Sequence, residues 1–255
     1  MAAFPLMLPG TSRPPKLVVF DLDHTLIACD ATILWTEFLY EKKIVTDPIW
    51  RQYDRDMVKS YAKGVLDIRD FCRKHAGAFR SIPEEKLHAL AQEFAKKKIA
   101  PLIFPDGKKW AKNALQANIP ACVLSASAAF IVKPIAKLFG LTDAMGIELA
   151  FKDGFCTGEI VGIPTFQEGK VERLSERLAE AGIGFEDVLF FTDSRNDLPL
   201  AERAGYTLCV NPDAVLESAA RKNGWKVAEW KLSLRTQMTA QVDAKGVPET
   251  QTVRS

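Results

Sequence analysis

The sequence lacks the features that mark several broad classes of protein. Its 34 basic and 32 acidic residues are mixed along the chain, so no basic stripe indicates a nucleic acid or an anionic membrane as a partner. No apolar run approaches the length that spans a bilayer. The five cysteines include no C-x-x-C pair, which disfavours a zinc site and indicates reduced, buried thiols.

The two ends of the chain are poor in recognisable signals. Residues 1–16, MAAFPLMLPGTSRPPK, have no basic leading region and are interrupted by prolines, so they make a poor signal peptide. Residues 239–255 are polar and almost free of aromatic side chains, which is typical of disorder. We therefore expect a soluble cytoplasmic protein with an N-terminal extension over 1–15 and a disordered tail over 232–255.

Short apolar runs alternate with helix-like segments along the chain. The runs are rich in β-branched residues and cover 17–20, 121–124, 188–191 and 207–210. This alternation is the pattern of a parallel sheet covered by helices on both faces. We predict a doubly wound α/β core domain over 16–30 and 106–231, and the chain of 255 residues is long enough to bury such a core.

The segment between the first two runs contains no convincing strand. Large apolar residues recur there at helical spacing, as in Tyr53, Met57 and Tyr61. We therefore predict a helical cap inserted over 31–105, which enters directly after the first strand and lies over the strand ends as a lid. Residues 147–162 alternate around an Asp-Gly pair and predict a β-hairpin.

Polar side chains stand where the predicted strands end. Asp21 and Asp23 follow the first run, Ser125 the second and Asp193 the third, while Lys170 begins an amphipathic helix. In open α/β sheets, ligands bind just outside the carboxyl ends of the strands. Residues i and i+2 of a strand point to one side, so Asp21 and Asp23 converge and need a cation or a shared proton.

Taken alone, each of these features is weak, because an isolated D-x-D more often caps a turn. Their conjunction favours a site: three carboxylates, with Asp197 near them, would be untenable in a partly closed cavity without a divalent cation. An all-oxygen ligand set favours Mg²⁺. A lysine and a hydroxyl beside it supply the charge and the donor that a phosphate dianion needs.

These residues carry a resemblance to the haloacid-dehalogenase-like phosphatases, in their phosphoserine-phosphatase-like and histidinol-phosphatase-like branch. The resemblance covers about residues 16–230, and a helical cap after the first motif also matches that branch. Four motifs occur in the expected order: D-x-D-x-T at Asp21, Asp23 and Thr25; Ser125 in VLSAS; Lys170; and Asp193 with Asp197 in TDSRNDLPL.

The resemblance implies a division of labour. Asp21 would attack phosphorus and form an aspartyl-phosphate, and Asp23 would act as the acid and then the base. Mg²⁺ would be held by Asp21, Asp193 and the backbone carbonyl of Asp23. The remaining residues would bind phosphate or support the site: Thr25, Ser125 and Lys170 for phosphate, and Asn196 and Asp197 as supports.

Substrate choice is expected to depend on Asp30 and His75. Asp30 matches an acidic position with which phosphoserine phosphatases bind substrate, and His75 stands where their cap arginine would be. The missing carboxylate clamp favours an amino-alcohol phosphate such as histidinol phosphate as the small-metabolite substrate. A phosphoserine or broad-specificity phosphatase stays open, and so, more distantly, does a phosphoacceptor signalling module or a non-catalytic scaffold.

Overall fold

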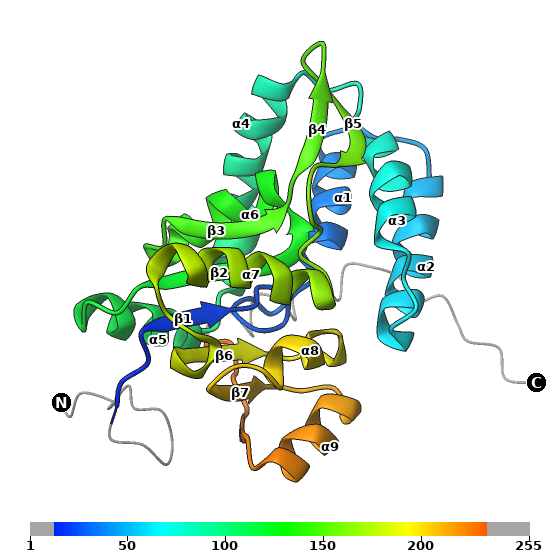
Figure 1. The fold of residues 1–255 in the computed structure, drawn as a ribbon. Coiled ribbons are helices and arrows are strands. Elements are labelled where there is room, and N and C mark those ends of the chain that lie inside the picture. The colour runs from blue at the N-terminus through cyan, green and yellow to red at the C-terminus, as the bar shows by residue number, and fades with distance from the viewer. Residues whose placement is uncertain (1–12, 234–255) are drawn as a thin grey trace, which may run out of the picture.

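The centre of the molecule is a six-stranded parallel sheet, seen in a computed structural model that describes residues 13–233 (Figure 1). The strand order is β3-β2-β1-β6-β7-β8. The four predicted apolar runs form the inner strands, so the predicted α/β class is confirmed, whereas the edge strands β3 and β8 were not predicted. The strands are β1 (Leu17–Phe20), β2 (Ala121–Ala128), β3 (Asp143–Ile147), β6 (Val188–Thr192), β7 (Tyr206–Val210) and β8 (Lys226–Ala228).

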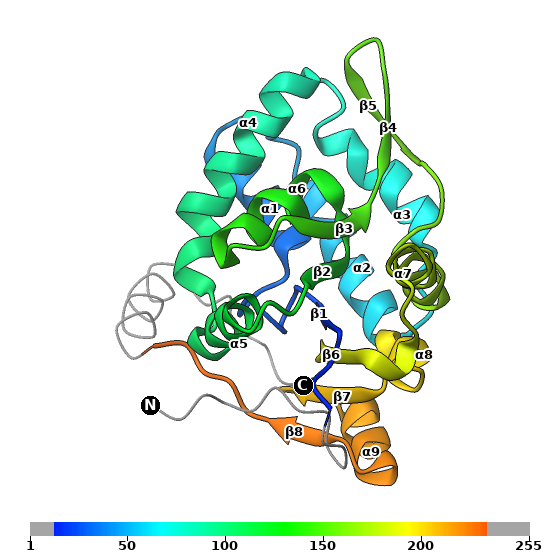
Figure 2. The same cartoon turned by 60° about the vertical axis from the view of Figure 1, so that its left-hand side comes forward.

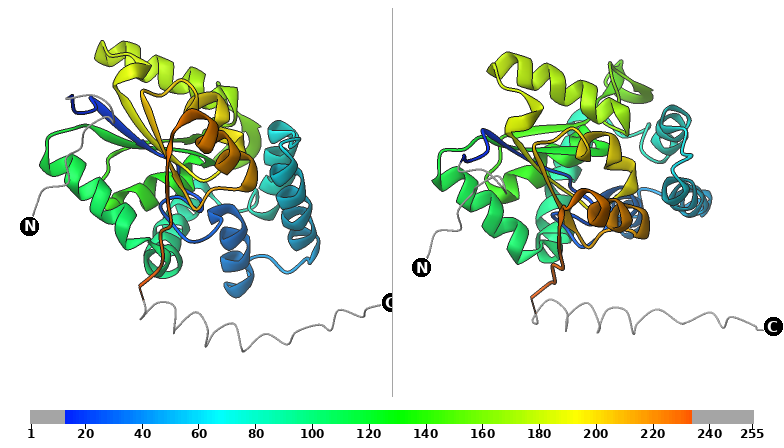
Figure 3. Two further views of the ribbon diagram at one scale, coloured as in Figure 1. Left: turned by 90° about the horizontal axis from the view of Figure 1, so that it is seen from below. Right: turned by 60° about the horizontal axis from the view of Figure 1, so that its bottom comes forward.

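Both faces of the sheet are covered because side chains alternate along each inner strand. Val18 and Phe20 pack into a cluster with α5 (Pro105–Gln116) and α6 (Ala129–Ala136). The intervening side chains, such as Val19, pack against α7 (Glu168–Ala181), and Figure 3 shows α5 and α7 on opposite sides of the sheet. Helices α8 (Leu198–Ala201) and α9 (Ala214–Asn223) complete the core.

Four helices stand at one end of the sheet, within the segment expected to be the cap (Figure 1). They are α1 (Ala31–Glu41), α2 (Ile49–Lys63), α3 (Ile68–His75) and α4 (Glu84–Phe94). The Trp35 ring packs edge to face against Phe94 and Phe130, with centroids 5.4 and 5.5 Å apart. This aromatic cluster joins α1 and α4 to α6, so no break in packing marks the predicted boundary between core and cap.

The predicted hairpin forms from β4 (Leu149–Lys152) and β5 (Phe155–Ile160). Its turn residues Asp153 and Gly154 have φ of 52° and 78°, as a tight hairpin turn requires. The hairpin packs against α3 (Figure 2), where a Cβ on Gly158 would lie 2.9 Å from the Cys72 carbonyl oxygen. Residues beyond the predicted insertion therefore contribute to the same end of the molecule.

Short helical turns connect these elements. They are η1 (Ala76–Ala78), the π-helical turn η2 (Ala95–Ile99), η3 (Ala100–Leu102), η4 (Lys137–Phe139), η5 (Phe185–Asp187) and η6 (Arg195–Asp197). Within residues 13–233, none of the helices has the length and apolar character needed to cross a membrane. Most of the expected disordered tail and most of the N-terminal extension lie outside the described residues.

Candidate active site

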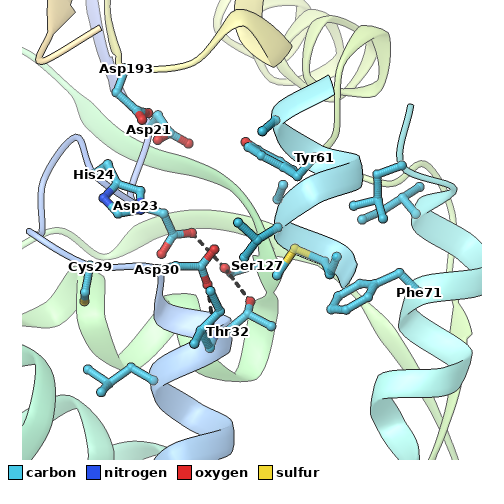
Figure 4. Close-up of a pocket in the computed structure, with 18 of the residues that line it drawn as sticks. Asp21, Asp23, His24, Cys29, Asp30, Thr32, Tyr61, Phe71, Ser127 and Asp193 are labelled. Carbon is cyan, nitrogen blue, oxygen red and sulfur yellow. Dashed lines mark hydrogen bonds between the residues drawn. The ribbon is translucent and has the colours of Figure 1, made fainter. Parts of the chain in front are cut away.

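The carboxyl ends of β1 and β6 bring Asp21 and Asp193 together. The two strands pair with Phe20 opposite Phe191, and the Asp21 N–H donates to the Phe191 carbonyl at 2.9 Å. Both carboxyl groups line a cavity of about 390 Å³, which Asp23 also lines. Figure 4 shows Asp21 and Asp193 next to each other. The sheet register thus brings carboxyl groups from the ends of two different strands to one edge of the sheet.

Lys170 lies behind these carboxylates, in the first turn of α7. Its Nζ is 2.7 Å from Asp21 Oδ1 and 2.7 Å from Asp197 Oδ1, and it is only 1% exposed. Burial lowers the pKa of Lys170, but the negative charges of Asp197 and Asp21 outweigh it, so the pKa is raised and the ammonium keeps its proton. Thr192 Oγ1 donates to Asp197 at 2.7 Å and fixes that carboxylate.

Three carboxylates lie near this single ammonium group, Asp21 and Asp197 in contact with it and Asp193 beside Asp21, so the site carries excess negative charge. Desolvation, followed by the charges of Asp21 and Asp197, raises the pKa of Asp193 well above its ordinary value. A net negative, all-oxygen donor set fits Mg²⁺. Within the described part of the chain, no group of three or more acidic, His or Cys side chains is placed to hold an ion alone, so backbone oxygen and water would complete the shell.

Asp23 lies in the segment that follows β1, and its carboxylate is held between two serines and the first N–H of α1. It accepts hydrogen bonds from Ser127 Oγ at 2.8 Å, Ser125 Oγ at 3.3 Å and the Ala31 N–H at 2.6 Å. Desolvation, and next the charge of Asp30, raises the pKa of Asp23 to about 6, against the effects of Ala31 and Ser127. A carboxyl group that titrates near neutral pH suits an acid that must later act as a base.

Two of the predicted phosphate ligands are not among the cavity-lining residues. Ser125 is fully buried behind Asp23, and its role toward phosphate stays a prediction. Thr25 is also fully buried, and its hydroxyl donates to Asp193 Oδ1 at 3.2 Å. In this structure Thr25 contacts a carboxylate of the site, and its assignment to phosphate stays a prediction.

The two predicted supporting residues differ in their contacts. Asp197 contacts Lys170, as expected. Asn196 does not: its Nδ2 donates to the Tyr61 carbonyl of α2 at 3.0 Å and lies 3.3 Å from Ser194 Oγ. The fourth motif therefore reaches the cap helices as well as the lysine.

His75 is not among the residues that line the cavity, and its role in specificity stays a prediction. It is buried, with Nε2 3.0 Å from Thr36 Oγ1 and 3.6 Å from Asp54 Oδ1, and its ring stacks on Phe71. Burial lowers the pKa of His75 to about 4, so the ring is neutral at physiological pH and cannot replace a cationic arginine. Phe71, one turn earlier, lines the cavity instead.

The rest of the cavity lining is apolar or acidic. Asp30 lies beside Asp23 (Figure 4) and caps α1, accepting from the Ile33 N–H at 2.9 Å, while Glu37 is paired with Arg51 at 2.7 Å. Among the described lining residues there is no lysine or arginine. The α2 and α3 segment supplies Met57, Val58, Tyr61, Ala62, Leu66, Ile68 and Phe71.

Several lining residues were not predicted as site residues. Ser127 could have been found, because it stands two positions after Ser125 in β2 and so shares its side of the strand. Thr32, whose Oγ1 is 3.0 Å from Ser127 Oγ, and Tyr61 gave no sequence signal beyond helical spacing.

Comparisons with known proteins agree with this geometry. A family model described as haloacid dehalogenase-like hydrolase matches residues 18–202. The chain is 34% identical over 220 residues to a histidinol-phosphatase of Neisseria meningitidis, covering 85% of this chain and 99% of that one. It is 30% identical over 257 residues to a probable phosphatase of Mycobacterium tuberculosis, covering 92% and 84%.

Solved structures show the same fold. A Bordetella pertussis protein of unknown function superposes with a TM-score of 0.75 at 31% identity, covering 83% of this chain and 96% of that one. A substrate-bound phosphoserine phosphatase superposes with a TM-score of 0.64 at 21% identity, covering 90% and 99%. The chain belongs to the haloacid dehalogenase-like hydrolases. Within that family it is a phosphatase, an enzyme that hydrolyses phosphoric monoesters.

Proposed function

We propose that this chain is a Mg²⁺-dependent phosphatase that cleaves small metabolite monoesters through a phosphorylated Asp21. The observation that carries the proposal is the placement of Asp21: it lines the cavity, contacts Lys170 and lies beside Asp193, while Asp23 follows two residues later. A carboxylate nucleophile, a cation behind it and an adjacent acid are what phosphoryl transfer to a side chain requires.

The reaction proceeds in two steps on these side chains. Asp21 forms a bond to phosphorus while the bond to the leaving oxygen breaks, and Asp23 donates its proton to that oxygen. Asp23 then takes a proton from the water that attacks the aspartyl-phosphate, which releases phosphate and restores Asp21. The pKa of Asp23, about 6, lets it serve in both directions near neutral pH.

Asp21, Asp193 and the backbone carbonyl of Asp23 would hold Mg²⁺. When bound, the ion offsets the repulsion between a carboxylate and a phosphate dianion and stabilises charge on the phosphoryl oxygens. Lys170 supplies a fixed positive charge behind Asp21. Ser125 would add a hydroxyl donor to the phosphoryl group after leaving its contact with Asp23.

The substrate best supported is an amino-alcohol phosphate such as histidinol phosphate. Asp30 offers a carboxylate to an ammonium group, and Met57 and Phe71 offer apolar surface to a ring. A substrate carboxylate would meet no lysine or arginine among the described lining residues, which disfavours phosphoserine. The relative named histidinol-phosphatase agrees with this choice. Five free thiols agree with a cytoplasmic location.

Phosphate release from a panel of monoesters, with Mg²⁺ or with EDTA, tests the proposal. We expect Asp21→Asn to lose at least ~10³-fold in kcat, as removal of a nucleophile commonly does. Asp153→Asn, in the hairpin turn, is the matched control and should keep full activity. Full activity of Asp21→Asn would contradict the nucleophile assignment, and a stable phosphoprotein without turnover would indicate a phosphoacceptor module.

A further inference from the structure

The last turn of α2 is held by two side chains from the catalytic loops. Gln167 Nε2 donates to the Gly64 carbonyl at 3.2 Å, and Asn196 Nδ2 donates to the Tyr61 carbonyl at 3.0 Å. Gln167 also donates to Asn196 Oδ1 at 3.2 Å. The last carbonyls of a helix lack the i+4 donor of the helix interior. The Tyr61 carbonyl accepts from the Gly64 N–H at 2.9 Å, and Asn196 gives it a second donor, while Gln167 supplies a donor to the Gly64 carbonyl. We call Gln167 and Asn196 the clamp.

The clamp belongs to the same loops as the reacting groups. Gln167 stands three residues before Lys170, and Asn196 directly precedes Asp197. Gln167 has φ 49° and ψ −123°, a conformation that residues other than glycine rarely adopt and that persists only where the surroundings enforce it. The position of α2 is thus fixed relative to Lys170 and Asp197.

Tyr61 is the side chain that this arrangement places over the carboxylates. Its ring packs on Phe166 with centroids 5.8 Å apart, and Figure 4 shows its hydroxyl pointing toward Asp21 and Asp193. Among the described α2 and α3 side chains that line the cavity, it alone carries a hydrogen-bond donor. A phosphoryl group under attack by Asp21 must lie about 3 Å from that carboxylate, on the side that the hydroxyl faces.

We propose that Tyr61 is a catalytic residue contributed by the cap, whose phenol O–H donates a hydrogen bond to the phosphoryl group, and that Gln167 and Asn196 are positioning residues that hold it there. This inference rests on the proposed function. The contact is to the phosphoryl group and not to the leaving group, so its loss affects every substrate by a similar factor.

Tyr61→Phe tests the contact because it removes one oxygen and keeps the ring. With Mg²⁺ present, we expect inorganic phosphate and orthovanadate to bind about 10- to 100-fold more weakly, as for a lost hydrogen bond to a charged group. The loss in kcat/KM should be similar for p-nitrophenyl phosphate and histidinol phosphate. Tyr53→Phe, on the same helix with its ring against Trp50, is the control and should change neither.

Unchanged phosphate binding, or a loss confined to one leaving group, would overturn the inference. Phosphate binding can be measured by calorimetry without turnover. A chain that binds phosphate but hydrolyses nothing would refute the proposed function. The phosphate affinities of the original protein and of Tyr61→Phe would still decide the role of Tyr61. A chain that binds no phosphate would overturn both.

A double-mutant cycle tests the clamp. Gln167→Ala should weaken phosphate binding by several-fold and add little in the Tyr61→Phe background, because the clamp acts through Tyr61. Gln52→Ala, which removes a glutamine from the exposed face of α2, is the matched control. Losses that multiply in the double variant would show that Gln167 acts independently, which contradicts the positioning role.

Discussion

The floor of the cavity is lined by charged and polar groups, whereas its helical wall is mainly apolar. The floor, formed by Asp21, Asp23 and Asp193 with Lys170 behind them, is a network of charged groups bonded to one another and to serine and threonine hydroxyls. The wall, formed by α2 and α3, presents apolar surface, and only two residues of α2 are buried, Asp54 and Met57. The floor therefore holds the groups proposed to react at phosphorus, and the apolar part of the wall is proposed to face the leaving group. Tyr61 is the wall side chain proposed to contact the phosphoryl group, and substitutions should separate these roles.

The largest effect is expected at Lys170. Lys170→Met leaves Asp21 and Asp197 without their counter-ion, and breaking a buried pair in this way costs about 3–5 kcal/mol. Thermal unfolding should show a Tm lower by roughly 10 °C, with activity lost on all substrates. Adding Asp197→Asn should recover part of the Tm but no activity. An unchanged Tm in the single variant would contradict the account of the floor.

A selective effect is expected at Asp30, where floor and wall meet. Asp30→Asn keeps the cap of α1, since Asn and Asp are equally good N-caps, but it removes the charge offered to an ammonium group. We expect kcat/KM for histidinol phosphate to fall about 10- to 100-fold. The value for p-nitrophenyl phosphate, which has no ammonium, should stay nearly constant. Equal losses on both substrates would show that Asp30 contributes to the hydrolysis of every monoester and does not select the leaving group.

A smaller effect is expected at Ser127, which supports the acid. Its hydroxyl lowers the pKa of Asp23, so Ser127→Ala should raise that pKa above its value of about 6. The leaving alkoxide needs protonated Asp23, so kcat/KM should fall as pH rises through this pKa. The falling limb of the pH profile should therefore move to higher pH in the variant. An unmoved limb would exclude Asp23 as the acid.

The smallest effect concerns the stability of the wall. Asp54 lies 3.6 Å from neutral His75, and neither carboxylate oxygen has a hydrogen-bond partner among the described residues. Desolvation raises the pKa of Asp54 to about 7, so the folded state holds this proton more tightly than the unfolded state does. The stability from this group is present below pH 4 and is lost as pH rises through about 7.

Asp54→Asn should therefore stabilise the protein above pH 7 and have a shrinking effect toward pH 5. The gain corresponds to about 1–3 kcal/mol for an unsatisfied buried group, or a Tm higher by a few degrees. Thermal unfolding from pH 5 to 8 measures it. A difference that does not depend on pH would show that ionisation of Asp54 is not its cause.

The floor could be predicted from the sequence because its chemistry depends on strand ends, which local patterns reveal. Asp21 and Asp193 meet through the register of β1 and β6, as the apolar runs before them indicated. The wall could not be predicted, because the face that α2 turns to the cavity depends on packing across the whole cap. The surroundings of His75 illustrate this: counting positions gave its place along α3 but not its burial beside Thr36.

The central claim is that this enzyme hydrolyses phosphate monoesters whose leaving group is cationic and lacks a carboxylate. The most direct test is kcat/KM for histidinol phosphate and for phosphoserine, measured side by side on the purified protein with Mg²⁺. We expect histidinol phosphate to be hydrolysed at least ~10-fold more efficiently, because the described residues that line the cavity include Asp30 but no lysine or arginine. Faster hydrolysis of phosphoserine would contradict the claim.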